Sequence, residues 1–417
     1  MTDETKIARP RGTRDILPSE QPLWRHVMRE AERLCDLYGY RPISTPVFEE
    51  TKLFERTSGS GSDVVQKEMY TFEDRSGRSL TLRPEATAPI CRAYVENGMH
   101  RASQPTKLYT VGPFYRYATP QRGRYREFWQ LSVEAIGSDD PALDAEVIQL
   151  YDTLLDRLGV PGHELELNSI GCRACRPAYL EKLGAWLEAN AERLDAASRE
   201  KAVGNPLRLF DNLDSKPAAI QQVLGEAPVI GESLCAACRE HFTAVRRQLD
   251  GVGVSYRLVP TLVRGLDYYT RTTWEFVEPG RGSQSALSGG GRYDGLVEEI
   301  GGPPTPGVGF GAGIERLVLA LEEADVSIRP PVIEVFIAAD DDAPRERIAR
   351  WLTELRGRGV SADADYAGRS LKGQLTQAAR LGASTIVVAR AGGALIRRAG
   401  APDEEIGLDE VVERVTA

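Results

Sequence analysis

The pattern of apolar residues changes once along the chain, and a proline pair marks the change. Before Arg329-Pro330-Pro331, expected helices are mixed with pairs of neighbouring strands, such as residues 107–115 and 127–136. After it, strands and helices alternate, which is typical of a small α/β domain with a mostly parallel sheet. The 417 residues are enough for two or three domains. We therefore expect a domain boundary at this linker.

Composition limits the class of protein. Apolar residues make up 41% of the chain, and 52 Lys and Arg against 61 Asp and Glu give a net charge of −9. This is typical of a folded protein, and it argues against coating of nucleic acid by bulk charge, but not against a local basic cleft. No apolar run approaches the roughly 20 residues that span a bilayer, and residues 1–10 lack the apolar core of a signal peptide. We expect a cytoplasmic protein with no membrane partner.

Two pairs of cysteines enclose a mainly helical stretch, residues 172–250. Cys172 and Cys175 form the first pair, and Cys235 and Cys238 form the second. Two such pairs in a cytosolic chain suit a structural Zn²⁺ site of four thiolates. Four reduced thiols at helix starts, or a redox-sensitive pair, suit the same spacing, and the sequence leaves these alternatives open.

Four segments combine charged side chains with glycines and expected strands. They cover residues 81–87, 112–134, 262–271 and 307–316. Arginine holds phosphate through two parallel hydrogen bonds, and glycine lets a backbone approach a ligand closely. Taken singly, Arg124 and Arg126 would also suit a solvated turn, and Arg316 would also suit an ion pair with Glu315 or another acid. Taken together, the four segments indicate a polyphosphate site.

The order and wording of these segments resemble the class II aminoacyl-tRNA synthetases, and specifically the histidyl-tRNA synthetase family. The segment around Pro46 resembles motif 1, the dimer interface, while the segments around Arg116 and Arg316 resemble motifs 2 and 3. Residues 264–269 and 288–295 resemble the two histidine-specific signatures. The resemblance covers nearly the whole chain.

The resemblance implies a fold, an activity and partners. Residues 1–171 and 251–329 would form an α+β catalytic domain built on an antiparallel sheet, with a helical insertion at 172–250. Residues 332–417 would form a C-terminal α/β anticodon-binding domain. The family activates L-histidine with ATP and Mg²⁺, transfers it to the 3′ end of tRNA(His), and forms homodimers, and the resemblance implies the same here.

The resemblance also implies how ATP is held. Arg116 would hold the α-phosphate, and Arg124 and Arg316 would hold the outer phosphates. Phe128 would stack on adenine, since aromatic faces favour such stacking.

The implied catalytic residues are Arg116 and Arg264. Arg264 would lie at the α-phosphate opposite Arg116 and stabilise the charge that develops there. Gly265, beside it, would let the backbone come close to a ligand.

A further set of residues would bind histidine. Glu85 would accept a hydrogen bond from the substrate ammonium, and Glu134 and Tyr269 would contact the two imidazole nitrogens. Such hydrogen bonds reject analogues that lack the matching groups. The other residues implied to hold the amino acid or line its pocket are Thr87, Gln130, Arg264, Tyr268 and Tyr293.

Motif 2 departs from the family pattern at three positions. Ala118 and Thr119 stand where the family usually has a glutamate and an arginine, and Trp129 stands where it usually has histidine. We expect weaker ATP binding, or a compensating side chain, because the lost carboxylate would lie near the adenine. The arginines of the site remain, so we do not expect loss of the reaction.

Two other functions would also fit parts of the chain. A regulatory paralogue of the synthetase would bind histidine as an effector without catalysis, but such paralogues usually lack the final domain and have eroded motifs. A stand-alone ATP- or tRNA-binding module would not need the histidine signatures at 264–269 and 288–295.

Overall fold

The computed structural model describes residues 7–57, 59, 64–204, 206–211, 213, 216–280, 285–340 and 343–416. The chain divides into two compact units, Met1–Ile328 and Arg329–Ala417. The division lies beside the proline pair that the sequence marks as a linker. None of the helices in the described ranges is both long and apolar enough to cross a membrane.

The first unit is built on an eight-stranded sheet. Its strands are β1 (Arg41–Pro42), β5 (Thr106–Tyr115), β6 (Glu127–Ile136), β7 (Glu164–Ser169), β8 (Arg257–Leu258), β9 (Thr270–Val277), β10 (Ala286–Arg292) and β11 (Gly307–Gly313). Their order is β1-β5-β6-β11-β10-β9-β7-β8. All pairs are antiparallel except β1 with β5 and β7 with β8. The expected α+β class with an antiparallel sheet is confirmed, and each edge carries one parallel strand.

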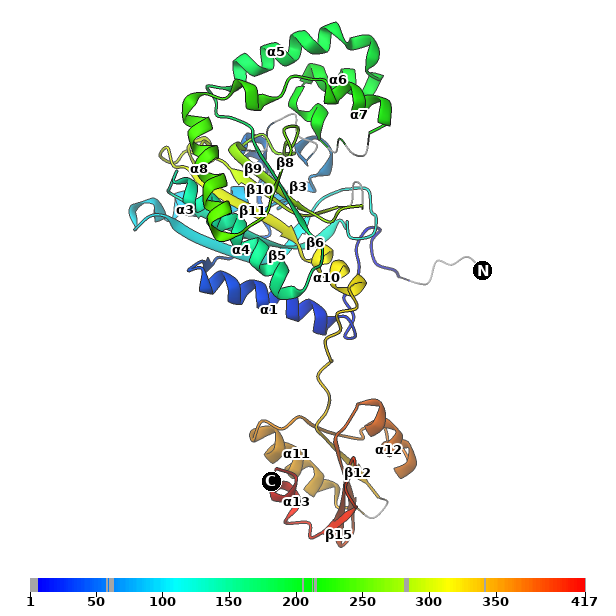
Figure 1. Cartoon of the computed structure of the whole chain (residues 1–417). Coiled ribbons are helices and arrows are strands. Elements are labelled where there is room, and N and C mark those ends of the chain that lie inside the picture. Colours follow the sequence, from blue (N-terminus) through cyan, green and yellow to red (C-terminus); the bar gives the residue numbers. More distant parts are fainter. Residues whose placement is uncertain are drawn as a thin grey trace. The chain divides into compact units, whose positions relative to one another are not determined.

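Four helices cover one face of this sheet (Figure 1). They are α1 (Gln21–Leu37), α4 (Pro141–Leu158), α8 (Ala236–Val252) and α10 (Ile314–Glu323). α4 begins after Asp140, whose side chain accepts the N–H of Ala142 at 2.9 Å, and it ends at Gly159 with a φ of 77°. The apolar side chains of these helices and of the sheet form one large core.

Shorter elements lie against the opposite face. The helices are α2 (Thr51–Thr57), α3 (Thr87–Glu96) and α9 (Leu296–Glu299), and a π-helical turn spans Val64–Glu68. A second, three-stranded sheet pairs β2 (Phe48–Glu50), β4 (Ser79–Leu82) and β3 (Thr71–Glu73) in antiparallel fashion. α3 packs through Ile90, Cys91 and Tyr94 on this face of the main sheet.

The stretch between the cysteine pairs is helical, as expected. It contains α5 (Arg176–Ala189), α6 (Ala196–Gly204) and α7 (Ala218–Gly225), which gather at one end of the unit, and it leads into α8 (Figure 1). Leu183, Leu209 and Leu224 are buried among these helices, and they belong to the same apolar cluster as α3. The helices α5 to α7 therefore pack with the elements on the α3 face of the sheet, whereas α8 lies on the other face.

The second unit has a five-stranded sheet of order β13-β12-β14-β15-β16. Its elements are β12 (Val335–Ala339), α11 (Arg345–Gly357), β13 (Ala362–Ala364), α12 (Leu371–Arg380), β14 (Thr385–Arg390), β15 (Gly393–Arg398), β16 (Glu404–Ile406) and α13 (Val411–Thr416). α11 and α13 pack on one face and α12 on the other, so the unit has three layers.

The expectation of a mostly parallel sheet in this unit is wrong. β12 pairs in parallel with β13 and β14, but β14–β15 and β15–β16 are antiparallel. The cause is a tight hairpin in which Arg390 pairs with Gly393. The two residues between them, Ala391 and Gly392, leave no room for the helix that a parallel connection requires.

Candidate active site

The site lies on the sheet face that carries α3, and the period of two along each strand puts its residues there. In β6, Leu131, Val133 and Ala135 point into the large core. The alternate residues of β6, Gln130 and Glu134 among them, therefore point to the other face. One strand thus contributes both to the core and to the site.

Glycines of the two central strands form the floor of the site. A Cβ added at Gly309 would clash with the Glu134 carboxylate, and one at Gly311 would lie 2.7 Å from Gln130 Nε2. A Cβ at Gly289 would clash with the Arg264 guanidinium. These positions require glycine because polar or charged side chains lie directly over the backbone.

A cavity of about 300 Å³ opens above this floor. It brings together ten of the twelve residues that the sequence assigned to ATP or histidine, although they come from distant segments. These ten lining residues are Glu85, Thr87, Arg116, Arg124, Phe128, Gln130, Arg264, Tyr268, Tyr269 and Arg316. The other two, Glu134 and Tyr293, lie behind the cavity wall and are buried.

Arg116 contacts a backbone carbonyl and an aromatic ring. Its Nε donates to the carbonyl of Pro84 at 2.8 Å, and its guanidinium lies 5.3 Å from the centre of the Phe128 ring. Burial lowers the pKa of Arg116, but an arginine pKa is high enough for the group to stay charged at neutral pH. The cavity therefore keeps a cation next to an aromatic face.

Arg124 pairs with an acid that the sequence did not single out. Its Nη2 lies 2.8 Å from Oε1 of Glu68, at the end of the π-helical turn. The Arg124 side chain is 48% exposed, so this pair is open to exchange for a ligand phosphate. The turn Arg124 occupies is therefore tied to a separate segment of the unit.

Glu315 does not need Arg316 as its partner. Both of its carboxylate oxygens accept the backbone N–H of Trp129, at 2.9 and 3.1 Å. Burial raises the pKa of Glu315 to about 7. The acid of Glu315 therefore has a partner without an ion pair to Arg316.

Arg264, like Arg124, pairs with an acid that the sequence did not single out. Its Nη1 donates to Oε1 of Glu275 in β9 at 2.7 Å. Burial lowers the pKa of Arg264, but the charge and hydrogen bond of Glu275, together with the charges of Tyr269 and Asp211, raise it, and the net direction is upward. The Nε of Arg264 is buried without a hydrogen-bond partner among the described residues. Arg264 is one of the residues that line the cavity.

Glu85 caps the helix that borders the cavity. Its carboxylate accepts the N–H groups of Thr87 at 2.7 Å and Ala88 at 3.0 Å, and the Tyr268 hydroxyl lies 3.4 Å from it. Burial raises the pKa of Glu85, although these N–H bonds oppose the shift. The acid is fixed by α3 and lines the cavity.

Glu134 lies deeper, between two hydroxyl donors. Thr87 Oγ1 donates to one carboxylate oxygen at 2.7 Å, and the Tyr293 hydroxyl donates to the other at 2.5 Å. Burial raises the pKa of Glu134 to about 8, although both hydrogen bonds favour the charged form. A buried, hydrogen-bonded acid of this kind is suited to a polar ligand group rather than to structural packing alone.

Two neighbouring residues of the second signature, Arg292 and Tyr293, have different roles. Tyr293 belongs to the Glu134 network, whereas the guanidinium of Arg292 contacts Asp144 of α4, with Nε 3.1 Å from Oδ2. Both members of the Arg292–Asp144 pair are fully buried. This pair fastens β10 to α4, and it holds Tyr293 in register.

Of the three departures in motif 2, Ala118 is the one that lines the cavity. Ala118 is buried and lines it, Thr119 is exposed, and Trp129 packs against the large core. The carboxylate of Glu315 and the phenol of Tyr125 line the same cavity. Polar groups therefore remain on this wall where Ala118 supplies none.

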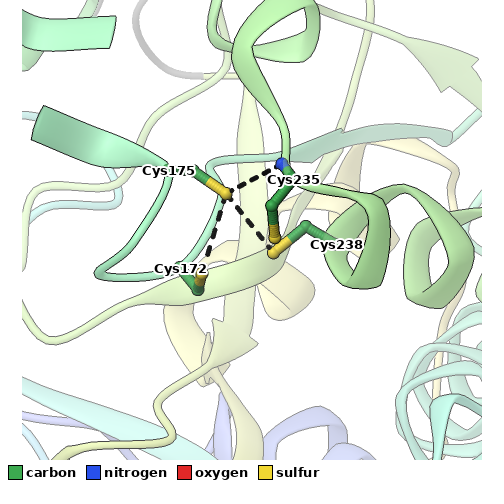
Figure 2. A group of neighbouring side chains, drawn as sticks. All are labelled: Cys172, Cys175, Cys235 and Cys238. Carbon is green, nitrogen blue, oxygen red and sulfur yellow. Dashed lines mark hydrogen bonds between the residues drawn. The ribbon is translucent and has the colours of Figure 1, made fainter. Parts of the chain in front are cut away.

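The four cysteines of the two pairs converge at the base of the insertion (Figure 2). Their Sγ atoms all lie within 4.8 Å of one another. Cys175 Sγ lies 3.6 Å from that of Cys172 and 3.7 Å from that of Cys238. Burial raises the thiol pKa of Cys172, but hydrogen bonds from backbone N–H groups and from the thiols of Cys175 and Cys238 together lower it to about 7. All four are free cysteines.

The arrangement suits one class of chemistry. Four guanidinium groups line a cavity that acids and phenols also line, so the cavity suits a polyanion together with a small polar cation or heterocycle. Preorganised donors in a part-buried cavity stabilise charge that develops at a phosphoryl group.

Comparisons with known proteins agree with this arrangement. A family model described as histidyl-tRNA synthetase matches residues 12–317. A protein of Desulforudis audaxviator (strain MP104C), named histidine–tRNA ligase, is 49% identical over 416 residues, which cover 98% of each chain. The crystal structure of apo S. aureus histidyl-tRNA synthetase superimposes with a TM-score of 0.82 at 36% identity and covers 99% of this chain and 100% of that one. A Bacillus halodurans structure described as an ATP phosphoribosyltransferase regulatory subunit/histidyl-tRNA synthetase gives 0.64 at 25%, covering 92% and 98%. The chain belongs to the histidyl-tRNA synthetase family.

Proposed function

We propose that the chain is a histidine–tRNA ligase of the cytoplasm. It would convert L-histidine and ATP to histidyl-adenylate and pyrophosphate, and then transfer the histidyl group to tRNA(His) with release of AMP. The observation that carries this proposal is the single cavity in which four arginines, at positions 116, 124, 264 and 316, meet Glu85 and the two tyrosines 268 and 269.

In the activation step, ATP enters as its Mg²⁺ complex. Arg124 and Arg316 take the outer phosphates, and Phe128 stacks on the adenine. Arg116 and Arg264 grip the α-phosphate while the histidine carboxylate attacks the phosphorus in line and pyrophosphate leaves. Positioning and electrostatic stabilisation supply most of the acceleration, because no covalent step on the protein is needed.

Histidine is recognised in the same cavity. Glu85 accepts a hydrogen bond from the ammonium, with Thr87 and Gln130 beside it. Glu134 and Tyr269 contact the imidazole, and Tyr268 and Tyr293 complete the pocket. Supporting this, the Glu134 carboxylate is fully buried and accepts a hydrogen bond from Thr87, which lines the cavity. A buried acid without a matching substrate donor is costly, so analogues that lack the ring nitrogens are rejected.

Transfer to tRNA completes the reaction. The terminal ribose hydroxyl of tRNA(His) attacks the carbonyl of the adenylate, and AMP leaves. Residues 1–171 and 251–329 would act as the catalytic domain, 172–250 as the helical insertion, and 332–417 as the anticodon-binding domain. Residues 332–417 carry fewer Lys and Arg than Asp and Glu, so contact with RNA would rest on local groups such as Arg369 and Lys372 and on unstacked bases.

A homodimer is part of the proposal. Next to Pro46, Val47 and Phe48 are 40% and 47% exposed, and Phe72 of the neighbouring β3 is 43% exposed. The Phe48 and Phe72 rings lie 6.4 Å apart, so they form one apolar patch. Such a patch marks an interaction surface, and two-fold dimers are the commonest oligomers.

Structural Zn²⁺ at the four cysteines is also part of the proposal. A tetrahedral site with Zn–S distances of about 2.3 Å places its sulfurs roughly 3.8 Å apart. The 3.6 and 3.7 Å separations around Cys175 support this geometry, and they are much longer than the S–S bond of a disulfide.

The test of the proposed function is tRNA charging. Purified protein is incubated with ATP, Mg²⁺ and total bacterial tRNA, and each labelled amino acid is tried in turn. Acid-precipitable label is expected with histidine alone. Label with another amino acid, or with none, would refute the assignment.

A further inference from the structure

The loop that carries the first cysteine pair touches the backbone of the first histidine signature. Arg176, directly after Cys175, donates through Nη2 to the backbone carbonyl of Tyr269. Its Nε lies 3.5 Å from the carbonyl of Ile170. One guanidinium thus joins the cysteine loop to the tyrosine that lines the cavity.

A pair of backbone hydrogen bonds reinforces this connection. Ile170 donates its N–H to the Arg271 carbonyl, and Arg271 donates its N–H to the Gly171 carbonyl, both at 2.8 Å. Gly171 has a φ of +65°, and a Cβ there would lie 2.9 Å from Cys175 Cβ. The chain therefore enters the cysteine loop in close contact with both the cluster and the segment after Tyr269.

The same loop also contacts the second signature. Arg173, between the two cysteines, donates to Oε1 of Glu299 at 2.5 Å. Its guanidinium also lies over Gly295, where a Cβ would clash with it. Gly295 follows Tyr293 by two residues, so the Cys172–Cys175 loop is fastened to both segments that form the histidine pocket.

We propose that the four-cysteine site sets the affinity for histidine through Arg176, which acts as a positioning residue for Tyr269. The ligand of the site is a thiophilic divalent cation, Zn²⁺, held by Cys172, Cys175, Cys235 and Cys238. Binding of the ion fixes the loop, the loop fixes Arg176, and Arg176 holds the Tyr269 carbonyl. This inference rests on the proposed function for the identity of the amino acid.

The first measurement is histidine affinity of the full-length Arg176→Ala protein by titration calorimetry, with zinc content by elemental analysis. Loss of one charged hydrogen bond predicts a histidine Kd about tenfold higher, with one zinc per chain retained. In ATP–pyrophosphate exchange, the histidine KM should rise by the same factor, while kcat and the ATP KM stay within twofold. Arg176→Lys should recover part of the affinity.

The second cysteine pair offers a matched control. Arg239 follows Cys238 as Arg176 follows Cys175, and it donates to the carbonyl of Leu234 at 2.8 Å, not to the pocket. Arg239→Ala should leave histidine Kd unchanged. A structural role of the insertion alone would make the two variants alike.

Removal of zinc tests the other half of the proposal. Chelation of the wild-type protein should raise the histidine Kd about as much as Arg176→Ala, and added Zn²⁺ should restore it. In the Arg176→Ala protein, chelation should have little further effect, because the two changes act through one path. A protein that binds no zinc, or an Arg176→Ala Kd within twofold of wild type, overturns the inference. Absence of histidine binding by the wild type instead refutes the proposed function and the inference with it.

Discussion

Arg264 gives the sharpest test of how the cavity works. Its guanidinium lies over Gly289, is held by Glu275 at 2.7 Å, and keeps a buried Nε without a partner among the described residues. The group is thus fixed before ATP arrives, so little reorganisation is needed at the moment of reaction. Charge moves between the attacking carboxylate and the α-phosphate during the reaction. The interaction of the Arg264 guanidinium with these groups should therefore strengthen in the transition state.

Removal of one such preorganised donor typically costs about 10²–10³ in kcat, or roughly 2.7–4 kcal/mol. We expect Arg264→Ala to lower kcat for histidine-dependent pyrophosphate exchange by that factor, with a much smaller change in ATP KM. Arg264→Lys should recover little, because a single ammonium keeps the pair with Glu275 but not the planar fork.

Arg257 offers a control for the loss of an ion-paired arginine. It lies in β8 at the edge of the same sheet, pairs with Glu166, and its side chain is 59% exposed. Arg257→Ala should leave kcat unchanged. Circular dichroism establishes that each variant is folded. A folded Arg264→Ala enzyme within threefold of wild type in kcat would refute the reasoning.

Three further outcomes are expected. Burial raises the pKa of Glu134 to about 8, so the native carboxyl keeps a proton that the unfolded chain loses above about pH 4.5. The stability of the fold therefore falls as the pH rises from about 4.5 to about 8, by about 1.4 kcal/mol per pH unit. Glu134→Gln should remove this part of the loss in thermal unfolding at pH 5 and 8.5 while weakening histidine binding; an unchanged pH dependence would contradict the pKa. Light scattering at micromolar concentration should give twice the chain mass of 45.8 kDa, and a monomer mass would count against the dimer. Removal of residues 331 to 417 should spare exchange but strongly weaken tRNA charging, and full charging by the shortened chain would give the second unit another role.

Much of the fold could be predicted because local patterns decide it. The apolar spacing predicts a helix over residues 21–37 and strands over 127–136 and 79–82, and the structure has these bounds. The last two strands, β15 and β16, were missed because the pattern of alternating strands and helices favoured parallel pairing. Instead, a hairpin with a two-residue loop between Arg390 and Gly393 reverses the chain.

The sequence predicted ten residues that line the cavity, but not their partners, and the roles of these residues toward ATP and histidine stay predictions. The residues were identified through wording shared with a family, whereas Glu68 pairs with Arg124 across 56 positions and follows no local pattern. Glu275 could have been found from the sequence, because residues 272–276 have the pattern of a strand and Glu275 is its charged residue, eleven positions after Arg264. A Cβ at Gly265 would meet no protein atom of the described residues within 4 Å, so its role in letting a ligand come close stays a prediction. Gly289, opposite it in the fold, is the glycine on which Arg264 depends.

The most direct test of the central claim is ATP–pyrophosphate exchange by the unmodified protein with each of the twenty amino acids. Exchange reports adenylate formation itself, independently of tRNA, and the regulatory alternative predicts none. Exchange with histidine and with no other amino acid is the predicted result. Absence of exchange with histidine, or equal exchange with another amino acid, would contradict the account.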